Sequence, residues 1–179
     1  MTNRLGAVTI LGIALMTAQI GLAGDRAQEK MTKIEKQVRR ELVTLPYYNL
    51  FDTLSFSLYS GTVTLTGQVT RPLLKSDAEN VVKNIEGVTS VNNQIKVLPL
   101  SPNDNGLRLS LYRAIYGQAV LETLAVRAVP PIHIIVDNGQ VTLEGAVANA
   151  MQKTVAGMQA NSVPGVFSVT NNLLVDDAS

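Results

Sequence analysis

The side chains that most often perform chemistry in proteins are scarce in this chain. Among its 179 residues there is one histidine, His133, and no cysteine. A single histidine without cysteine cannot supply the ligands of an ordinary zinc site, and no nucleophile stands near it for a serine–histidine–acid arrangement. His133 lies in a run that alternates apolar and polar residues, which predicts a solvent-facing position on a strand. We therefore expect neither a metal site nor a catalytic histidine.

The acidic residues, the glycines and the net charge exclude further classes of function. No carboxylate pair stands out for acid–base work, and Asp176 and Asp177 follow the last expected strand. No glycine-rich phosphate loop of recognised spacing is present. The formal net charge of +1 gives no electrostatic basis for nucleic-acid binding. The sequence therefore predicts a protein that is not an enzyme, has no cofactor and binds no nucleic acid.

Glycines and aromatic residues remain as candidates for a binding site. Gly67 and Gly145 occupy inward positions in expected strands, where the missing side chain indicates either a helix packed tightly over the strand or a ligand contact. Tyr47, Tyr48 and Phe51 form an aromatic cluster that follows a helix rich in cations. This cluster either closes the open end of its domain or meets lipid headgroups.

Ile135 is the candidate for contacts between domains or chains. Alternation along the run from Ile132 to Val136 places Ile135 on the sheet face opposite the helices. An apolar side chain on an open face indicates a partner surface, and Phe167 raises the same expectation. The partner is either the other half of this chain or a second chain.

An internal repeat defines the elements that position these residues. The segment Gly61–Val69 (G-T-V-T-L-T-G-Q-V) returns as Gly139–Val147 (G-Q-V-T-L-E-G-A-V), an offset of 78 from residue 61 to residue 139. The same offset aligns Gly87–Val97 with Gly165–Val175 without a gap. This many coincident glycine and apolar positions indicate a duplicated domain.

Each copy reads as a mixture of strands and helices. The expected elements of the first copy are a helix over 31–45, a hairpin turning at 60–61, a helix from 72 to 86 and a strand over 88–97. The second copy turns its hairpin at 138–139, and its first helix is replaced by two short ones over 109–116 and 119–128. Its last helix is expected to bury an apolar stripe formed by Met151, Val155, Met158 and Val163.

The order of these elements predicts an α+β fold. It consists of two tandem α-β-β-α-β modules, each a three-stranded mixed sheet with its helices on one face. We expect module 1 over 31–98 and module 2 over 107–175. The segment 99–106, rich in proline, asparagine and aspartate, is expected to be the linker between them.

Residues 1–23 have the layout of a secretory signal peptide. A short polar start with Arg4 precedes an apolar run from Leu5 to Met16, and the small residues that follow favour cleavage after Ala23. The alternative is an uncleaved N-terminal anchor. Because no cysteine follows the apolar run, a lipid anchor is not expected. The mature protein is therefore predicted to be periplasmic.

Two motifs, G-x-V-x-L-x-G-x-V and then G-V-x-x-V-x-N-x-[IL]-x-V, occur in this order in each copy. This pattern resembles the BON family, named for bacterial osmotically inducible periplasmic proteins and nodulation-associated proteins. The resemblance implies a non-enzymatic envelope protein, of the osmotic-stress type, whose modules contact membrane phospholipid or other envelope components. The alternative is a protein–protein adaptor or scaffold in the envelope, with module–module or homo-oligomer contacts.

Overall fold

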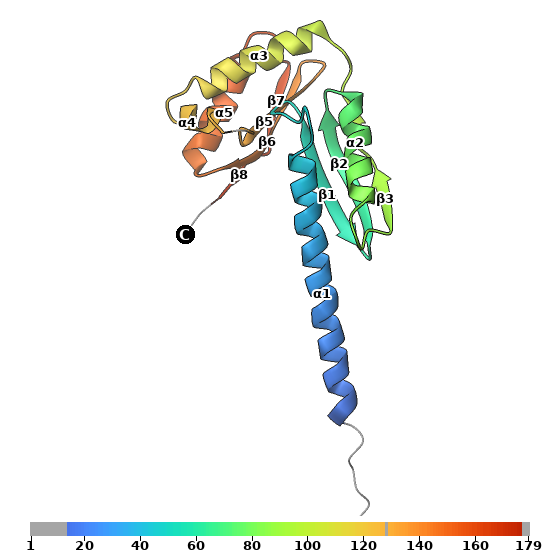
Figure 1. The fold of residues 1–179 in the computed structure, drawn as a ribbon. Helices are drawn as coiled ribbons and strands as arrows, with labels where there is room; N and C mark the ends of the chain where they lie inside the picture. Colours follow the sequence, from blue (N-terminus) through green and yellow to red (C-terminus); the bar gives the residue numbers. More distant parts are fainter. Residues whose placement is uncertain (1–13, 128, 177–179) are drawn as a thin grey trace, which may run out of the picture.

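The structure is a computed structural model that describes residues 14–127 and 129–176, so the first half of the expected leader lies outside it. Module 1 contains α1 (Ala14–Val43), β1 (Thr53–Tyr59), β2 (Thr62–Val69), α2 (Pro72–Lys83), β3 (Ser90–Asn93) and β4 (Lys96–Val97). Module 2 contains α3 (Pro102–Tyr116), α4 (Glu122–Ala125), β5 (Ile132–Asp137), β6 (Gln140–Val147), α5 (Ala150–Ser162), β7 (Ser168–Asn171) and β8 (Leu174–Val175). Each module has its own sheet (Figure 1).

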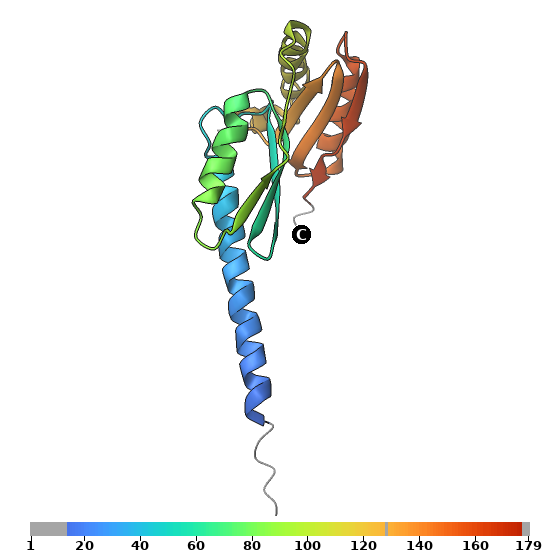
Figure 2. The same cartoon turned by 90° about the vertical axis from the view of Figure 1, so that its right-hand side faces the viewer.

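The strand of the first repeated motif is the centre of each sheet. β2 pairs antiparallel with β1 and parallel with β3 and β4, and β6 pairs in the same way with β5, β7 and β8. The helices of module 1 cover one face of its sheet (Figure 2). The predicted α+β fold of two repeated modules is therefore confirmed.

The motif asparagine explains why the last strand is divided in two. The amide nitrogen of Asn93 donates to the carbonyl oxygen of Lys75 in α2 at 2.9 Å, and its side-chain oxygen accepts from the backbone nitrogen of Ile95 at 3.2 Å. Asn171 makes the equivalent bonds to Lys153 and Leu173. The asparagine thus joins the edge of the sheet to the helix above it, and the ladder is interrupted at this point.

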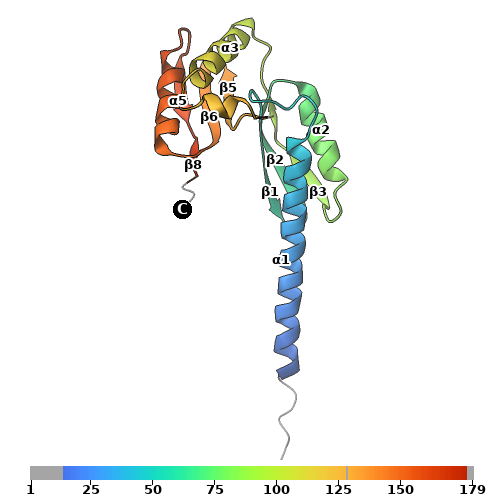
Figure 3. The ribbon, with the colours of Figure 1, turned by 60° about the vertical axis from the view of Figure 1, so that its left-hand side comes forward.

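The expected inner face of the first helix is confirmed. Ile34, Val38, Leu42 and Leu45 are all buried in the core of module 1, together with the inward side chains of β2 and α2. The helix itself begins earlier than expected and extends well beyond the sheet (Figures 1 and 3). Cleavage after Ala23 would fall inside α1 and stays a prediction. Within the described residues, no helix combines the length and the apolar character that a membrane crossing needs.

The segment 99–106, expected to be a linker, is mostly helical, because residues 102–106 form the first turns of α3. The side-chain oxygen of Ser101 accepts a hydrogen bond from the backbone nitrogen of Asp104 at 3.2 Å, and Pro102 occupies the start of the helix. Both residue types favour helix beginnings as strongly as they favour loops. The short helix α4 also covers less of the chain than the expected 119–128.

The predicted inner face of the last helix was also wrong in part. Met151 and Met158 are each 64% exposed, whereas Ala156, Gly157 and Ala160 are buried. A Cβ atom on Gly157 would lie only 2.7 Å from the side-chain nitrogen of Asn171, so the helix approaches the sheet too closely for large side chains. Of the expected stripe, Val163 is buried.

Candidate binding surfaces

The two strand glycines lie against the backbone of the neighbouring strand. Gly67 and Gly145 have positive φ values of +125° and +114°. A Cβ atom would come within 2.1 Å of the carbonyl oxygen of Thr53 at Gly67, and within 1.9 Å of that of Pro131 at Gly145. The close neighbour is therefore main chain of β1 at Gly67 and main chain just before β5 at Gly145, rather than a helix.

The loop after α1 is fixed by a buried carboxylate. One carboxylate oxygen of Asp52 accepts hydrogen bonds from the backbone nitrogen and the hydroxyl of Thr70 at 2.6 and 2.8 Å. The other accepts from the backbone nitrogen of Asn49 at 3.3 Å. Because Asp52 is fully buried, these bonds determine the path of the loop between α1 and β1.

The three aromatic side chains of this loop separate from one another. Tyr47 is 60% exposed, and the guanidinium carbon of Arg71 lies 4.8 Å from the centre of its ring. Tyr48 packs against the core of module 1, whereas Phe51 packs against the core of module 2. Only Tyr47 is thus available at the surface, and the other two rings link the modules.

His133 lies at the junction of the two modules, so its predicted solvent-facing position was wrong. Its Nδ1 atom is 2.6 Å from the carbonyl oxygen of Asp52, and its ring centre is 5.7 Å from that of Tyr48. Burial lowers the pKa of His133, because a charged imidazolium loses its hydration there; the neighbouring Asp52 carbonyl only partly offsets this effect.

Further hydrogen bonds join the loop to the sheet of module 2. The backbone nitrogen of Ile134 donates to the carbonyl oxygen of Leu50 at 2.7 Å. The hydroxyl of Thr53 donates to a carboxylate oxygen of Glu144 at 2.9 Å. Main-chain and side-chain contacts therefore hold the modules together at β5 and β6.

Ile135 is 2% exposed, although it belongs to the core of neither module. Its neighbours on the same sheet face both contact module 1: His133 meets Asp52, and Asp137 forms an ion pair with Lys96. We infer that module 1 covers Ile135, which corresponds to the module–module alternative. Phe167, for which a partner was also expected, is 82% exposed.

Two buried charged residues of α3 were missed by the sequence analysis. The carboxylate oxygens of Asp104 accept from the backbone nitrogens of Asn138 and Gly139, at 3.0 Å each, and so hold the hairpin of module 2. The guanidinium of Arg108 donates to the carbonyl oxygen of Val136 at 2.7 Å, and burial lowers its pKa. Their spacing of four on the inner face of a helix was the available signal.

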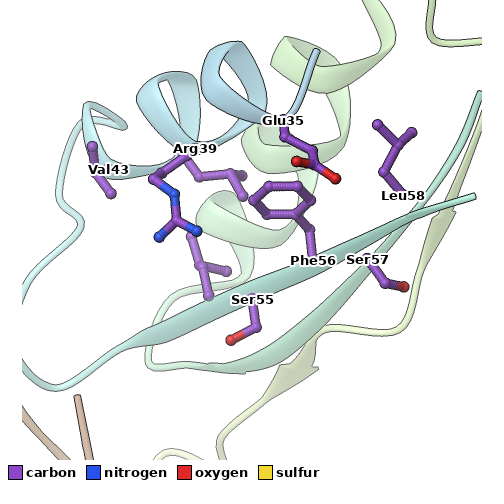
Figure 4. A pocket seen from close by; sticks show the side chains of 9 residues that line it. Glu35, Arg39, Val43, Ser55, Phe56, Ser57 and Leu58 are labelled. Carbon is purple, nitrogen blue, oxygen red and sulfur yellow. The ribbon is translucent and has the colours of Figure 1, made fainter. Parts of the chain in front are cut away.

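A groove of about 400 Å³ separates α1 from the edge strand β1 (Figure 4). The helix contributes Glu35, Arg39, Leu42 and Val43, and the strand contributes residues 54–58. A second hollow, of about 380 Å³, lies between α1 and the end of α2 and includes Lys30 and Lys33. Within residues 14–127 and 129–176, no three acidic or histidine side chains gather into a group that could hold a metal ion.

The face of α1 that points away from the sheet is cationic. Lys33, Lys36 and Arg40 are exposed, and their spacing of three and four places them on one side of the helix. Glu35 and Glu41 lie on other sides of the helix, and Glu41 is only loosely paired with Arg40, at 3.8 Å. Glu29, exposed and four residues before Lys33, lies on the same side and offsets one of the three positive charges. The outer face of α1 therefore offers a stripe of positive charge to a partner.

These features define a protein of two tandem α+β modules joined by a tight junction. The BON domain family matches residues 30–99 and 117–177, and the chain therefore belongs to this family. The BON domain is a non-catalytic binding domain with roles in envelope and phospholipid binding, and proteins that carry it are typically periplasmic or envelope associated.

Two solved structures are similar to the chain. One is CdsD, a structural protein of the type III secretion system of Chlamydia trachomatis, with 15% identity over 80% of this chain and 92% of that chain, and a TM-score of 0.31. The other is the C-terminal domain of CdsD, with 15% identity over 78% of this chain and 96% of that one, and a TM-score of 0.28. At these TM-scores neither bears on function. No curated protein matches the chain.

Proposed function

We propose that the chain is an exported, non-enzymatic protein that binds anionic phospholipid at the envelope through the outer face of α1. The observation that carries this proposal is the stripe of Lys33, Lys36 and Arg40, and family membership supplies the ligand class. A cation near an anionic membrane contributes about 1 kcal/mol, so three of them contribute about 3 kcal/mol. Binding should therefore be weak, reversible and sensitive to salt.

The proposal does not depend on whether the leader is removed. All three cations follow the expected cleavage position, so a version beginning at Gly24 keeps the stripe. If the leader is retained as an anchor, the stripe stays near the membrane that holds it.

Co-sedimentation with vesicles tests the proposal. A version starting at Gly24 should pellet with vesicles rich in phosphatidylglycerol at about 20 mM NaCl, and should be released at about 500 mM. It should not pellet with pure phosphatidylcholine. Failure to bind the anionic vesicles at low salt would overturn the proposal.

A matched pair of variants locates the contact. Lys33→Glu with Lys36→Glu should abolish pelleting, because the stripe is reversed. Arg113→Glu with Arg127→Glu changes the net charge equally at exposed positions of module 2 and should leave pelleting intact. Equal losses in both double variants would show that net charge, and not the outer face of α1, drives binding.

A further inference from the structure

The groove between α1 and β1 exposes one edge of the first sheet. Leu65 of β2 accepts a hydrogen bond from Gln94 on its other side, so its partner in β1, Phe56, turns its backbone nitrogen and oxygen outward. The same alternation turns the backbone groups of Leu54 and Leu58 outward. The side chains of all three line the groove under α1 (Figure 4).

The duplicated module shows what this fold places at such an edge. The offset of 78 relates Leu54, Phe56 and Leu58 to Ile132, Ile134 and Val136 of β5. In β5 each of these three residues has a partner for an outward backbone group. Ile132 pairs with the hydroxyl of Tyr116, and the backbone nitrogen of Ile134 donates to the carbonyl oxygen of Leu50. The carbonyl oxygen of Val136 accepts from the guanidinium of Arg108. The middle position is thus filled by main chain from a separate segment.

The edge of module 1 lacks this closure. Burial raises the pKa of Tyr48 to about 12, and a hydrogen bond with the backbone of Leu54 acts in the opposite direction, so Leu54 has a partner in Tyr48. The outward backbone groups of Phe56 and Leu58 have no partner within residues 14–127 and 129–176. Unpaired edge groups of this kind are a template for another strand.

The dimensions of the layers leave room for that strand. Two packed helices have axes about 8–10 Å apart, whereas neighbouring strands lie about 4.8 Å apart. Two helices therefore cover about three to four strands, and the sheet of module 1 has three across. An antiparallel pairing with a second copy of β1 is disfavoured, because it would bring the second α1 to the same space above the edge.

We propose that the groove takes an extended peptide segment of a partner protein as a fourth strand beside β1. The main chain of the segment pairs with Phe56 and Leu58, and its alternate apolar side chains enter between Phe56 and Leu42. At the rim, neither Arg39 nor Glu35 forms an ion pair within the described part of the chain. Arg39 favours an acidic side chain in the segment. This inference is independent of membrane binding by the outer face of α1.

Fluorescence anisotropy with the full chain tests the proposal. The probe is a labelled seven-residue peptide that alternates valine and threonine, with one threonine replaced by aspartate. Saturable binding is expected, and Arg39→Glu should weaken it at least about tenfold, or about 1.4 kcal/mol. Arg113→Glu, which makes the same charge change at an exposed position of module 2 outside the groove, should leave the affinity unchanged. Circular dichroism confirms that both variants fold.

Two further measurements show whether main-chain pairing is responsible. The same peptide with methylated backbone nitrogens at alternate positions should not bind. Hydrogen exchange at the amides of Phe56 and Leu58 should slow when the unmodified peptide is added.

Several outcomes would overturn the proposal. One is the absence of saturable binding up to about 1 mM peptide. Others are equal binding of the methylated peptide, an unchanged affinity in Arg39→Glu, or a concentration-dependent dimer in which β1 amides become protected. Protection of these amides by anionic vesicles but not by peptide would assign the groove to lipid instead.

Discussion

At the scale of single residues, a glycine can be required by its own sheet rather than by a ligand. Gly67 has a positive φ, and the carbonyl oxygen of Thr53 occupies the space of a side chain. An alanine at this position would have to adopt a strained positive φ. Its Cβ atom would also collide with the carbonyl oxygen of Thr53 in the paired strand β1.

Gly67→Ala should therefore lower the free energy of unfolding by at least about 3 kcal/mol. Gly106→Ala is the control: a Cβ atom there meets nothing within 4 Å, and the position lies inside α3. The control should be neutral or stabilising by about 0.5–1 kcal/mol. Urea unfolding followed by circular dichroism measures both. Equal midpoints would contradict the strain argument.

His133 gives the junction a dependence on pH. Its pKa in the folded protein is below the ordinary value of 6.5, so the folded state favours the neutral ring. The contribution to stability is complete above pH 6.5 and is lost as the pH falls through 6.5 toward the lower folded pKa. The nearby carboxylates of Asp52 and Glu144 partly oppose the shift.

The melting temperature should therefore fall between about pH 7 and pH 5.5 in the natural chain. His133 is the only histidine, so His133→Gln should flatten this part of the profile. Differential scanning calorimetry at constant ionic strength provides the comparison. A slope that persists in His133→Gln would place the titrating group elsewhere.

At the scale of elements, α5 shows that packing distance can override the apolar pattern of a helix. Methionines at the helix surface are exposed, and small residues face the sheet because the helix lies close to it. The spacing of large apolar residues predicts the buried face of a helix only when such residues are absent from its exposed face.

Ala160→Asp should consequently destabilise the protein by about 3 kcal/mol or more, because it buries an unpaired charge. Met158→Asp introduces the same charge on the exposed side of α5 and should change the stability by less than about 0.5 kcal/mol. Thermal unfolding by circular dichroism distinguishes the two. If Met158→Asp were the more damaging variant, the orientation of α5 would be wrong.

At the scale of the whole molecule, the junction turns two duplicated modules into one unit. Ile135 is buried between His133 and Asp137, which both contact module 1, whereas its counterpart Ser57 in module 1 is exposed. The same sheet face is thus covered in one copy and open in the other. This difference is what makes the two modules unequal.

Ile135→Lys should separate the modules without unfolding either core, since Ile135 belongs to neither. We expect a loss of about 2–4 kcal/mol in the coupling between modules, because a charge replaces a buried apolar contact. Small-angle scattering should show a larger radius of gyration. Ser57→Lys is the matched control and should keep the compact form; an unchanged radius in Ile135→Lys would show that other contacts suffice.

The sequence by itself determined the duplication, the order of the elements and the buried face of α1. These features are local: a strand alternates with a period of two, a helix with one of 3.6, and the Asn138–Gly139 turn takes the positive φ values of 52° and 76° that both residues tolerate. The family resemblance followed from the same local motifs. The helices and strands of both modules follow one another in the order that the sequence predicts.

Only the tertiary structure decided where the surfaces are. His133 does point away from the core of module 2, as the alternation along its strand predicts. Alternation does not show, however, whether a second module covers that face. The partner of Ile135, the fixed loop around Asp52 and the open edge beside Phe56 all depend on contacts between segments far apart in the chain. The sequence gives only the types of the residues that make these contacts, because the geometry of the contacts arises when the modules dock.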